Sequence, residues 1–243
     1  MQSNPPPVSS IHLRPAAARG HVSMGWLDTW HSFSFGDYYD PKNMGFRNLR
    51  VINDDRVAAG RGFPTHPHQD MEILTYVLAG ALTHKDSLGT GSTILPGDVQ
   101  RMSAGTGIRH SEANPSAAEP LHLLQIWILP THRGVAPGYE QKHFEDVQKR
   151  GRLALVLSPD GAEGSVRASA DARLFATLLA PGEQVTHLAP AGRHTYVHVA
   201  RGRALVAGQL LGPGDAATTD GPAIVLEGQP GEVMAEVLVF DLP

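Results

Sequence analysis

Short apolar runs that end at glycine or proline are the feature that most constrains the fold of this chain. Residues 71–78 and 121–128 are apolar at nearly every position, and they end close to Gly80 and Pro130. Strands that are covered on both faces give uninterrupted apolar runs of this length. Few segments show helical periodicity. The pattern therefore predicts an all-β protein built as a sandwich or a barrel.

Several other segments fit the same description. A polar connector is expected to form one short helical turn at residues 146–152. Further strands are predicted at residues 47–52, 153–157, 195–200 and 237–240.

The two halves of the chain share a weak repeat. In the first half a strand ends at Gly80, and a Pro-Gly-Asp turn follows at residues 96–98. In the second half a strand ends at Gly202, and Gly-Pro-Gly-Asp follows at residues 212–215. A polar, turn-rich segment separates them. The recurrence predicts two copies of one barrel unit, in residues 1–135 and 136–243.

Composition excludes several classes of site. The 243 residues include no cysteine, which rules out disulfides, thiolate nucleophiles and iron–sulfur clusters. A metal ion would have to be held by histidine, aspartate or glutamate, and there are 13 histidines. The net charge of −4 and the lack of a long basic run argue against direct nucleic-acid binding.

No stretch approaches the roughly 20 apolar residues of a membrane span. The first residues lack the features of a secretory signal, and the prolines at positions 5–7 are expected to form a stiff, disordered entry. We therefore expect a cytoplasmic protein.

Two pairs of potential metal ligands, each two residues apart, are the most specific feature of the sequence. Alternate residues of a strand point to the same face, so His66 and His68 project together, roughly 6–7 Å apart along the backbone. His110 and Glu112 have the same spacing. If their strands face each other, three imidazoles and one carboxylate surround a single point. Such a set suits a divalent transition metal and leaves two positions of an octahedral ion open.

Other candidates are weaker. Glu72 is the alternative carboxylate, but it lies four residues beyond His68, about 13 Å along a straight strand. It is expected to support a ligand or to form a salt bridge at the barrel mouth. The remaining histidines considered are interpreted as core or surface residues: His31, His84, His122, His143, His187, His194 and His198.

These spacings resemble the two conserved motifs of the cupins. The first runs from Gly60 to Gly80, and the second runs from Gly97 to Asn114. The second motif departs from the common form, because Ser103 stands where proline is usual and His110 comes two residues later. This departure resembles the pirin branch. Longer matches are found at residues 25–35, 63–68 and 103–112.

The resemblance implies a bicupin, with two jelly-roll-type β-barrels. It implies a metal site in the N-terminal barrel, usually with iron, whose ligands are His66, His68, His110 and Glu112. Manganese, nickel, copper, cobalt and zinc are possible alternatives. After residue 152, the second half has no His-x-His and no His-x-Glu, which agrees with a cupin-like barrel that carries no metal.

Bacterial pirin-like proteins are similar to quercetin 2,3-dioxygenases. This implies an oxidoreductase that cleaves a flavonol such as quercetin with O2 and releases carbon monoxide, with Glu112 as the catalytic base. We expect a monomer whose partners are a small aromatic substrate and O2.

Two alternatives remain. The family also contains transcription cofactors, so a non-catalytic, metal-bearing and redox-sensing interaction protein is the second hypothesis. A sugar isomerase ranks third, because the positions near the histidines are expected to be apolar. Those positions are Leu74, Tyr76, Met102 and Ile108.

Overall fold

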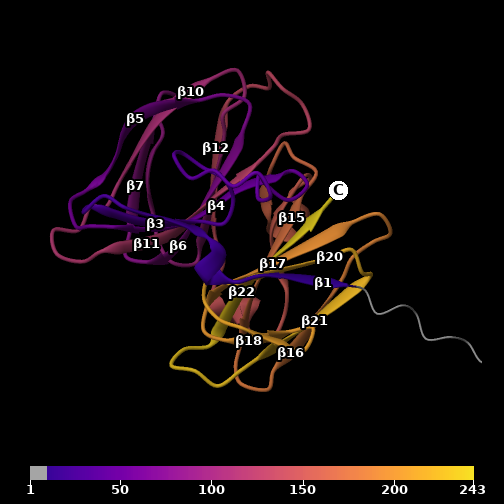
Figure 1. Cartoon of the computed structure of the whole chain (residues 1–243). Coiled ribbons are helices and arrows are strands. Elements are labelled where there is room, and N and C mark those ends of the chain that lie inside the picture. Colours follow the sequence, from indigo (N-terminus) through magenta and orange to yellow (C-terminus); the bar gives the residue numbers. More distant parts are fainter. Residues whose placement is uncertain (1–9) are drawn as a thin grey trace, which may run out of the picture.

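The computed structural model describes residues 10–243, so the expectation for the prolines at 5–7 lies outside the described residues. The chain forms two β-barrels side by side, each built from a seven-stranded and a four-stranded sheet (Figure 1). The bicupin prediction is confirmed. The predicted helical turn forms as α1 (Asp146–Lys149), and two short 3-10 turns are η1 (Ala16–Ala18) and η2 (Ala162–Gly164).

The first barrel contains the histidine constellation. Its larger sheet has the order β12 (Gly138–His143), β9 (Asp98–Ser103), β6 (Glu72–Ala79), β11 (Leu121–Ile128), β4 (Leu49–Val57), β3 (Leu27–His31) and β2 (Gly20–Ser23). Its smaller sheet has the order β5 (Gly62–His68), β10 (Ile108–Ala113), β7 (Leu82–Asp86) and β8 (Gly91–Ile94).

The second barrel repeats this plan strand for strand. Its larger sheet has the order β1 (Ile11–Arg14), β20 (Ala216–Thr219), β17 (His194–Arg201), β22 (Ala235–Leu242), β15 (Arg173–Leu179), β13 (Ala154–Ser158) and β14 (Val166–Arg167). Its smaller sheet has the order β16 (Gln184–Leu188), β21 (Ala223–Gly228), β18 (Ala204–Val206) and β19 (Gln209–Leu211). Within residues 10–243, no helix is long and apolar enough to cross a membrane.

Edge strands cross the expected domain boundary in both directions. Strand β1, from the start of the chain, pairs with β20 of the second barrel. Strand β12, which follows residue 135, pairs with β9 of the first barrel. The two strands occupy equivalent edges of the repeated sheets. The division at residues 135 and 136 stays a prediction, and this exchange ties the two units together.

The largest apolar cluster lies between the two large sheets and includes residues of both barrels. Leu74, Tyr76 and Leu78 of β6 belong to it, and the Tyr76 hydroxyl donates to Glu236 Oε1 of the second barrel at 2.6 Å. The intervening side chains of β6 face the interior of the first barrel. Both faces of β6 are therefore buried, which explains its continuous apolar run.

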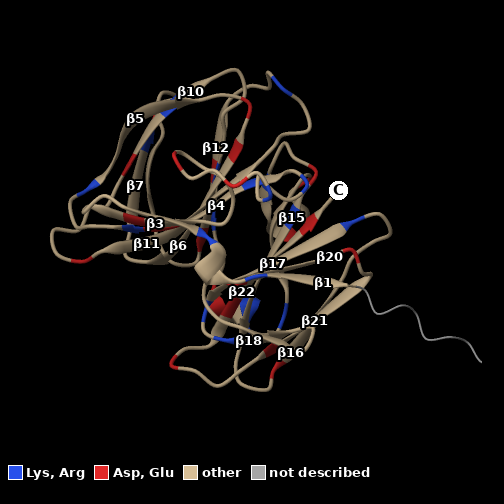
Figure 2. Cartoon of the chain, viewed as in Figure 1, with Lys and Arg blue, Asp and Glu red and all other residues tan. Residues whose placement is uncertain are grey.

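Segments that mark Lys and Arg and segments that mark Asp and Glu occur in both barrels (Figure 2). Over residues 10–243 the ribbon shows no long run of Lys and Arg, and the expected absence of direct nucleic-acid binding stays a prediction.

Candidate metal centre

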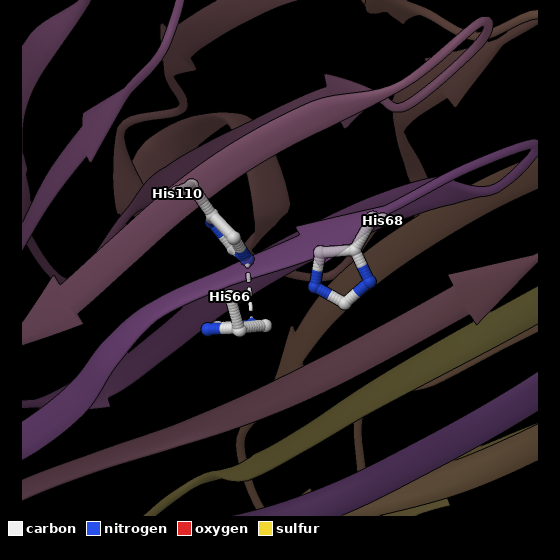
Figure 3. A group of neighbouring side chains, drawn as sticks. All are labelled: His66, His68 and His110. Carbon is white, nitrogen blue, oxygen red and sulfur yellow. Dashed lines mark hydrogen bonds between the residues drawn. The ribbon is translucent and has the colours of Figure 1, made fainter.

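Strand pairing brings the two histidine motifs together. Strands β5 and β10 are antiparallel neighbours, with His110 directly opposite His66. The ligand atoms of His66, His68 and His110 all lie within 4.8 Å of one another (Figure 3). The Nε2 atoms of His66 and His110 are 3.0 Å apart. Two nitrogens about 2.1 Å from one ion, at right angles, would be separated by about 3 Å. The spacing therefore fits two adjacent ligands of one metal.

The protonation of these histidines also suits a metal. The Nδ1 atom of His66 lies 2.8 Å from the carbonyl oxygen of Pro64, so an N–H at Nδ1 leaves the Nε2 lone pair free. Burial, with a contribution from nearby His66, lowers the pKa of His68 to about 4 and that of His110 to about 2. The rings of His68 and His110 are thus neutral at pH 7, which is the form that binds metals.

Glu112 lies close to His110, which is one of the three histidines. One of its oxygens accepts from Thr75 Oγ1 at 3.3 Å, and the other accepts from Gln125 Nε2 at 2.8 Å. Burial raises the pKa of Glu112 to about 7, against the opposing effect of these two hydrogen bonds. Its carboxylate falls within 4.8 Å of His110 and His84, in a second group that shares His110 with the first.

His84 is the residue that sequence reasoning missed. It was interpreted as a core or surface residue, and it is fully buried. Its Nδ1 lies 3.5 Å from Nδ1 of His110, and its Nε2 lies 3.2 Å from Asp86 Oδ2. Strand β7 places it directly opposite Glu112. The position of His84 near the site follows from the pairing of β7 with β10, and a linear sequence motif does not contain that information.

Glu72 lies at the junction between the two halves of the chain, where it forms a long salt bridge. Its carboxylate accepts from Ser103 Oγ at 2.8 Å and from the backbone N–H of Ser169 at 3.1 Å, and Arg101 Nε lies 4.0 Å away. Ser169 lies between β14 and β15 of the second barrel, so Glu72 is buried at the junction between the two halves. Glu72 is separated from His68 because β5 ends at His68 and Glu72 begins β6, which belongs to the larger sheet.

A row of polar side chains crosses the large sheet beneath the histidines. Each member is paired with the next on the neighbouring strand, so all of them face the barrel interior. Most barrel interiors are filled by apolar side chains, so a row of this length points to a site. The row consists of His31, Asn53, Gln125, Thr75, Gln100 and Gln141.

A cavity of about 240 Å³ opens between the histidines and the large sheet. Its polar wall contains the three histidines, Glu112, and part of the polar row. Its apolar wall is formed by Val22, Met24, Leu27, Phe35, Phe63 and Trp127.

Two residues expected near the site lie elsewhere. Leu74 and Tyr76 point into the cluster between the barrels. Met102 and Ile108 belong to a small interior cluster that packs against Trp127, and Trp127 in turn lies edge-on to His68 with ring centroids 4.9 Å apart.

The second barrel has an apolar interior at the equivalent positions. Strands β16 and β21 pair as β5 and β10 do, which makes His187 and Ile224 the counterparts of His66 and His110. By the same register, Leu226 stands in place of Glu112. The counterparts of Thr75 and Gln125 are Val197 and Val239, which are paired and buried. One barrel thus contains the whole ligand-type set, and at the equivalent positions the other has a single histidine, His187.

The fold and the site define a bicupin with a histidine–carboxylate cluster in its first barrel. The family model described as pirin matches residues 12–128, and the model described as the quercetinase C-terminal cupin domain matches residues 155–242. The chain is 50% identical to a quercetin 2,3-dioxygenase of Escherichia coli over 96% of this chain and 99% of that protein. It is 42% identical to a pirin-like protein of Caulobacter vibrioides, over 88% and 93% of the two chains.

Solved structures agree. The crystal structure of YhhW from Escherichia coli superposes with a TM-score of 0.90 at 49% identity, covering 96% of this chain and 98% of that one. A structure of bacterial pirin YhhW in complex with nickel(II) gives 0.89 at 48% identity, covering 96% and 99%. This chain belongs to the pirin family.

Proposed function

We propose that this protein is a metal-dependent quercetin 2,3-dioxygenase, an oxidoreductase in which His66, His68, His110 and Glu112 hold one divalent metal. The observation that carries the proposal is the set of three imidazoles converging on the wall of a cavity. The relatives named quercetin 2,3-dioxygenase span nearly the whole chain, which supports the same activity here.

The donor set fits several first-row ions. Three imidazoles and a carboxylate accept iron, manganese, nickel, copper, cobalt or zinc, and we propose iron. The existence of a nickel(II) complex of YhhW supports the binding of a divalent ion here. When bound, the metal would supply Lewis acidity and a route for electrons between a flavonol and O2.

The chain's own residues would prepare the substrate. Because burial raises the pKa of Glu112 to about 7, its carboxylate can take a proton from a phenolic hydroxyl at neutral pH. The hydrogen bonds from Thr75 and Gln125 fix the direction of that carboxylate. Phe63 and Trp127 also line the cavity, where they can pack on a flat aromatic ring and exclude water.

The walls of the cavity favour this proposal over the alternatives. A sugar would need polar groups on all sides, whereas one wall here is aromatic and aliphatic. A non-catalytic interaction protein would need an apolar surface rather than a cavity with convergent polar groups. The expected monomeric state and the cytoplasmic location stay predictions.

Aerobic turnover of quercetin tests the proposal. Purified protein is stripped of metal and reconstituted separately with iron, manganese, nickel and copper, and flavonol absorbance and carbon monoxide release are followed. Metal-dependent loss of quercetin with carbon monoxide release, absent in His110→Ala, is expected. Failure of every metal ion to support turnover, in protein that binds one ion per chain, would contradict the enzymatic assignment.

A further inference from the structure

We propose that Asp55 is a specificity-determining residue, which binds a second hydroxyl group of an aromatic substrate on the side of the cavity formed by the large sheet, across from the histidines. This inference rests on the proposed function and adds the substrate feature that the cavity selects. The ligand class is an aromatic compound with two separated hydroxyl groups, one directed to the metal and one directed to Asp55.

Asp55 is buried and faces the cavity. It lies in the middle of β4, where it is paired with Thr29 of β3 and Leu123 of β11. Its side chain lines the cavity, although the residue is only 3% exposed. Among the described residues its Oδ1 makes no hydrogen bond of normal geometry, although the hydroxyl of Thr29 lies near enough to favour the ionised carboxylate.

Its neighbour Asp54 shows what a structural carboxylate looks like in the same strand. Asp54 points to the opposite face, where its oxygens accept from Arg19 at 3.2 Å and from Arg56 at 3.3 Å, and lie 2.7 Å from His122 Nε2. These contacts hold its pKa far below the usual range. No ion pair to Asp55 is found among residues 10–243. Asp54 is therefore paired with positively charged groups, whereas the next residue, Asp55, has no cation partner among the described residues.

An uncompensated buried carboxyl group is costly, and a ligand hydroxyl can remove that cost. Leaving a buried acceptor without a partner costs on the order of the desolvation of that group, whereas a ligand O–H supplies the missing bond. Burial, with the nearby negative charges of Asp54 and Glu112, raises the pKa of Asp55 to about 7 against the opposing effect of the Thr29 hydroxyl. The group can thus accept from a phenol as a carboxylate or donate to one as an acid, without needing a charged ligand.

The position of Asp55 gives selectivity. The three histidines lie on the small sheet, and Asp55 lies on the large sheet across the cavity. A rigid flat molecule with one hydroxyl at the histidines can reach Asp55 with a hydroxyl on another part of its ring system. A site built to bond a hydroxyl discriminates strongly against the analogue that lacks it.

The test compares two flavonols in each variant. Quercetin carries hydroxyl groups on all its rings, and 3-hydroxyflavone carries the 3-hydroxyl alone. Binding to metal-loaded protein is measured without oxygen by calorimetry, so turnover does not enter. The variants are Asp55→Leu, Asp55→Asn and, as a control, Asp37→Leu, which changes an exposed aspartate at the cavity mouth.

In Asp55→Leu, the ratio of quercetin affinity to 3-hydroxyflavone affinity is expected to fall at least about tenfold. Asp55→Asn, which keeps polar atoms at this position, should retain most of the ratio, and Asp37→Leu should leave it unchanged. Because both ligands are measured on the same protein, partial misfolding cancels from the ratio.

An unchanged ratio in Asp55→Leu would overturn the role of Asp55 while leaving the proposed function intact. If neither flavonol binds to the wild type, the proposed substrate class and this inference both fail. If 3-hydroxyflavone binds as tightly as quercetin to the wild type, the inference alone fails.

Discussion

The side-chain amide of Gln125 donates to Oε2 of Glu112 at 2.8 Å, across the interior from one sheet to the other. The contact joins the polar row of the large sheet to the histidine cluster on the small sheet. Because the bond favours the ionised carboxylate, it opposes the effect of burial on the pKa of Glu112.

Replacing Gln125 with leucine should make metal binding require a higher pH. Loss of the donor raises the pKa of Glu112 further above its value of about 7, and a carboxylate must be ionised to bind a metal. We expect the pH midpoint of metal binding to rise by about one unit, since a hydrogen bond to a charged group is worth about 1.5 kcal/mol or more. Titration of Ni²⁺ binding against pH measures it, with Gln100→Leu in the same polar row as control. Identical midpoints in the two variants would argue against Glu112 as a ligand.

Replacing His84 with alanine should weaken metal binding without removing a predicted ligand. His84 lies between His110 and Asp86, where it can fix the ring of His110. Loss of groups that orient a metal-bound histidine typically costs roughly ten- to a hundredfold in affinity. Calorimetric titration with Ni²⁺ measures the change, and His143→Ala on the outside of the same barrel is the control. An affinity equal to that of the wild type would show that His110 needs no such support.

A methyl group at Gly62 should disturb the centre through the backbone alone. A Cβ at this position would lie 2.1 Å from the carbonyl oxygen of Glu112 and 2.5 Å from Cα of Ala113, so β5 and β10 would have to separate. We expect Gly62→Ala to lower Ni²⁺ affinity at least about tenfold, because ligand placement within a fraction of an ångström decides metal affinity. Gly91→Ala in the same sheet has open space around it and should bind as the wild type does. Equal affinities for the two variants would show that the strands adapt.

The second barrel should show a pH-dependent stability that comes from His198. Neither of its ring nitrogens has a hydrogen-bond partner within the described part of the chain, and burial lowers its pKa to about 4. Arg19 lowers this pKa as well, whereas Asp54 and Asp215 oppose the shift.

The unfolded chain takes up this proton near pH 6.5 and the folded chain near pH 4, so stability is lost as the pH falls through that interval. The loss attributable to His198 is up to about 3 kcal/mol. Denaturant unfolding of metal-free protein between pH 7 and 4 should show a shallower decline in His198→Leu. Parallel declines in variant and wild type would exclude His198 as the source.

The sequence predicts the three histidines of the site better than it predicts the residues and strands that surround them. The spacing of His66, His68 and His110 is a property of single strands, and each strand was recognisable from its apolar run and the turn that ends it. The role of His84 and the exchange of β1 and β12 depend on which strands become neighbours, and linear periodicity does not contain that information. Glu72 shows the limit as well, because its contact with Ser169 of the second barrel depends on how the two barrels pack.

The metal content of single histidine variants tests the central claim most directly. His66→Ala, His68→Ala, His110→Ala and the exposed control His21→Ala are each stripped with chelator, reloaded with one equivalent of Fe²⁺ or Ni²⁺ and analysed for bound metal. One ion per chain is predicted for the wild type and for His21→Ala, with a large loss in each of the other three. Full occupancy in all three would place the metal elsewhere and contradict the account.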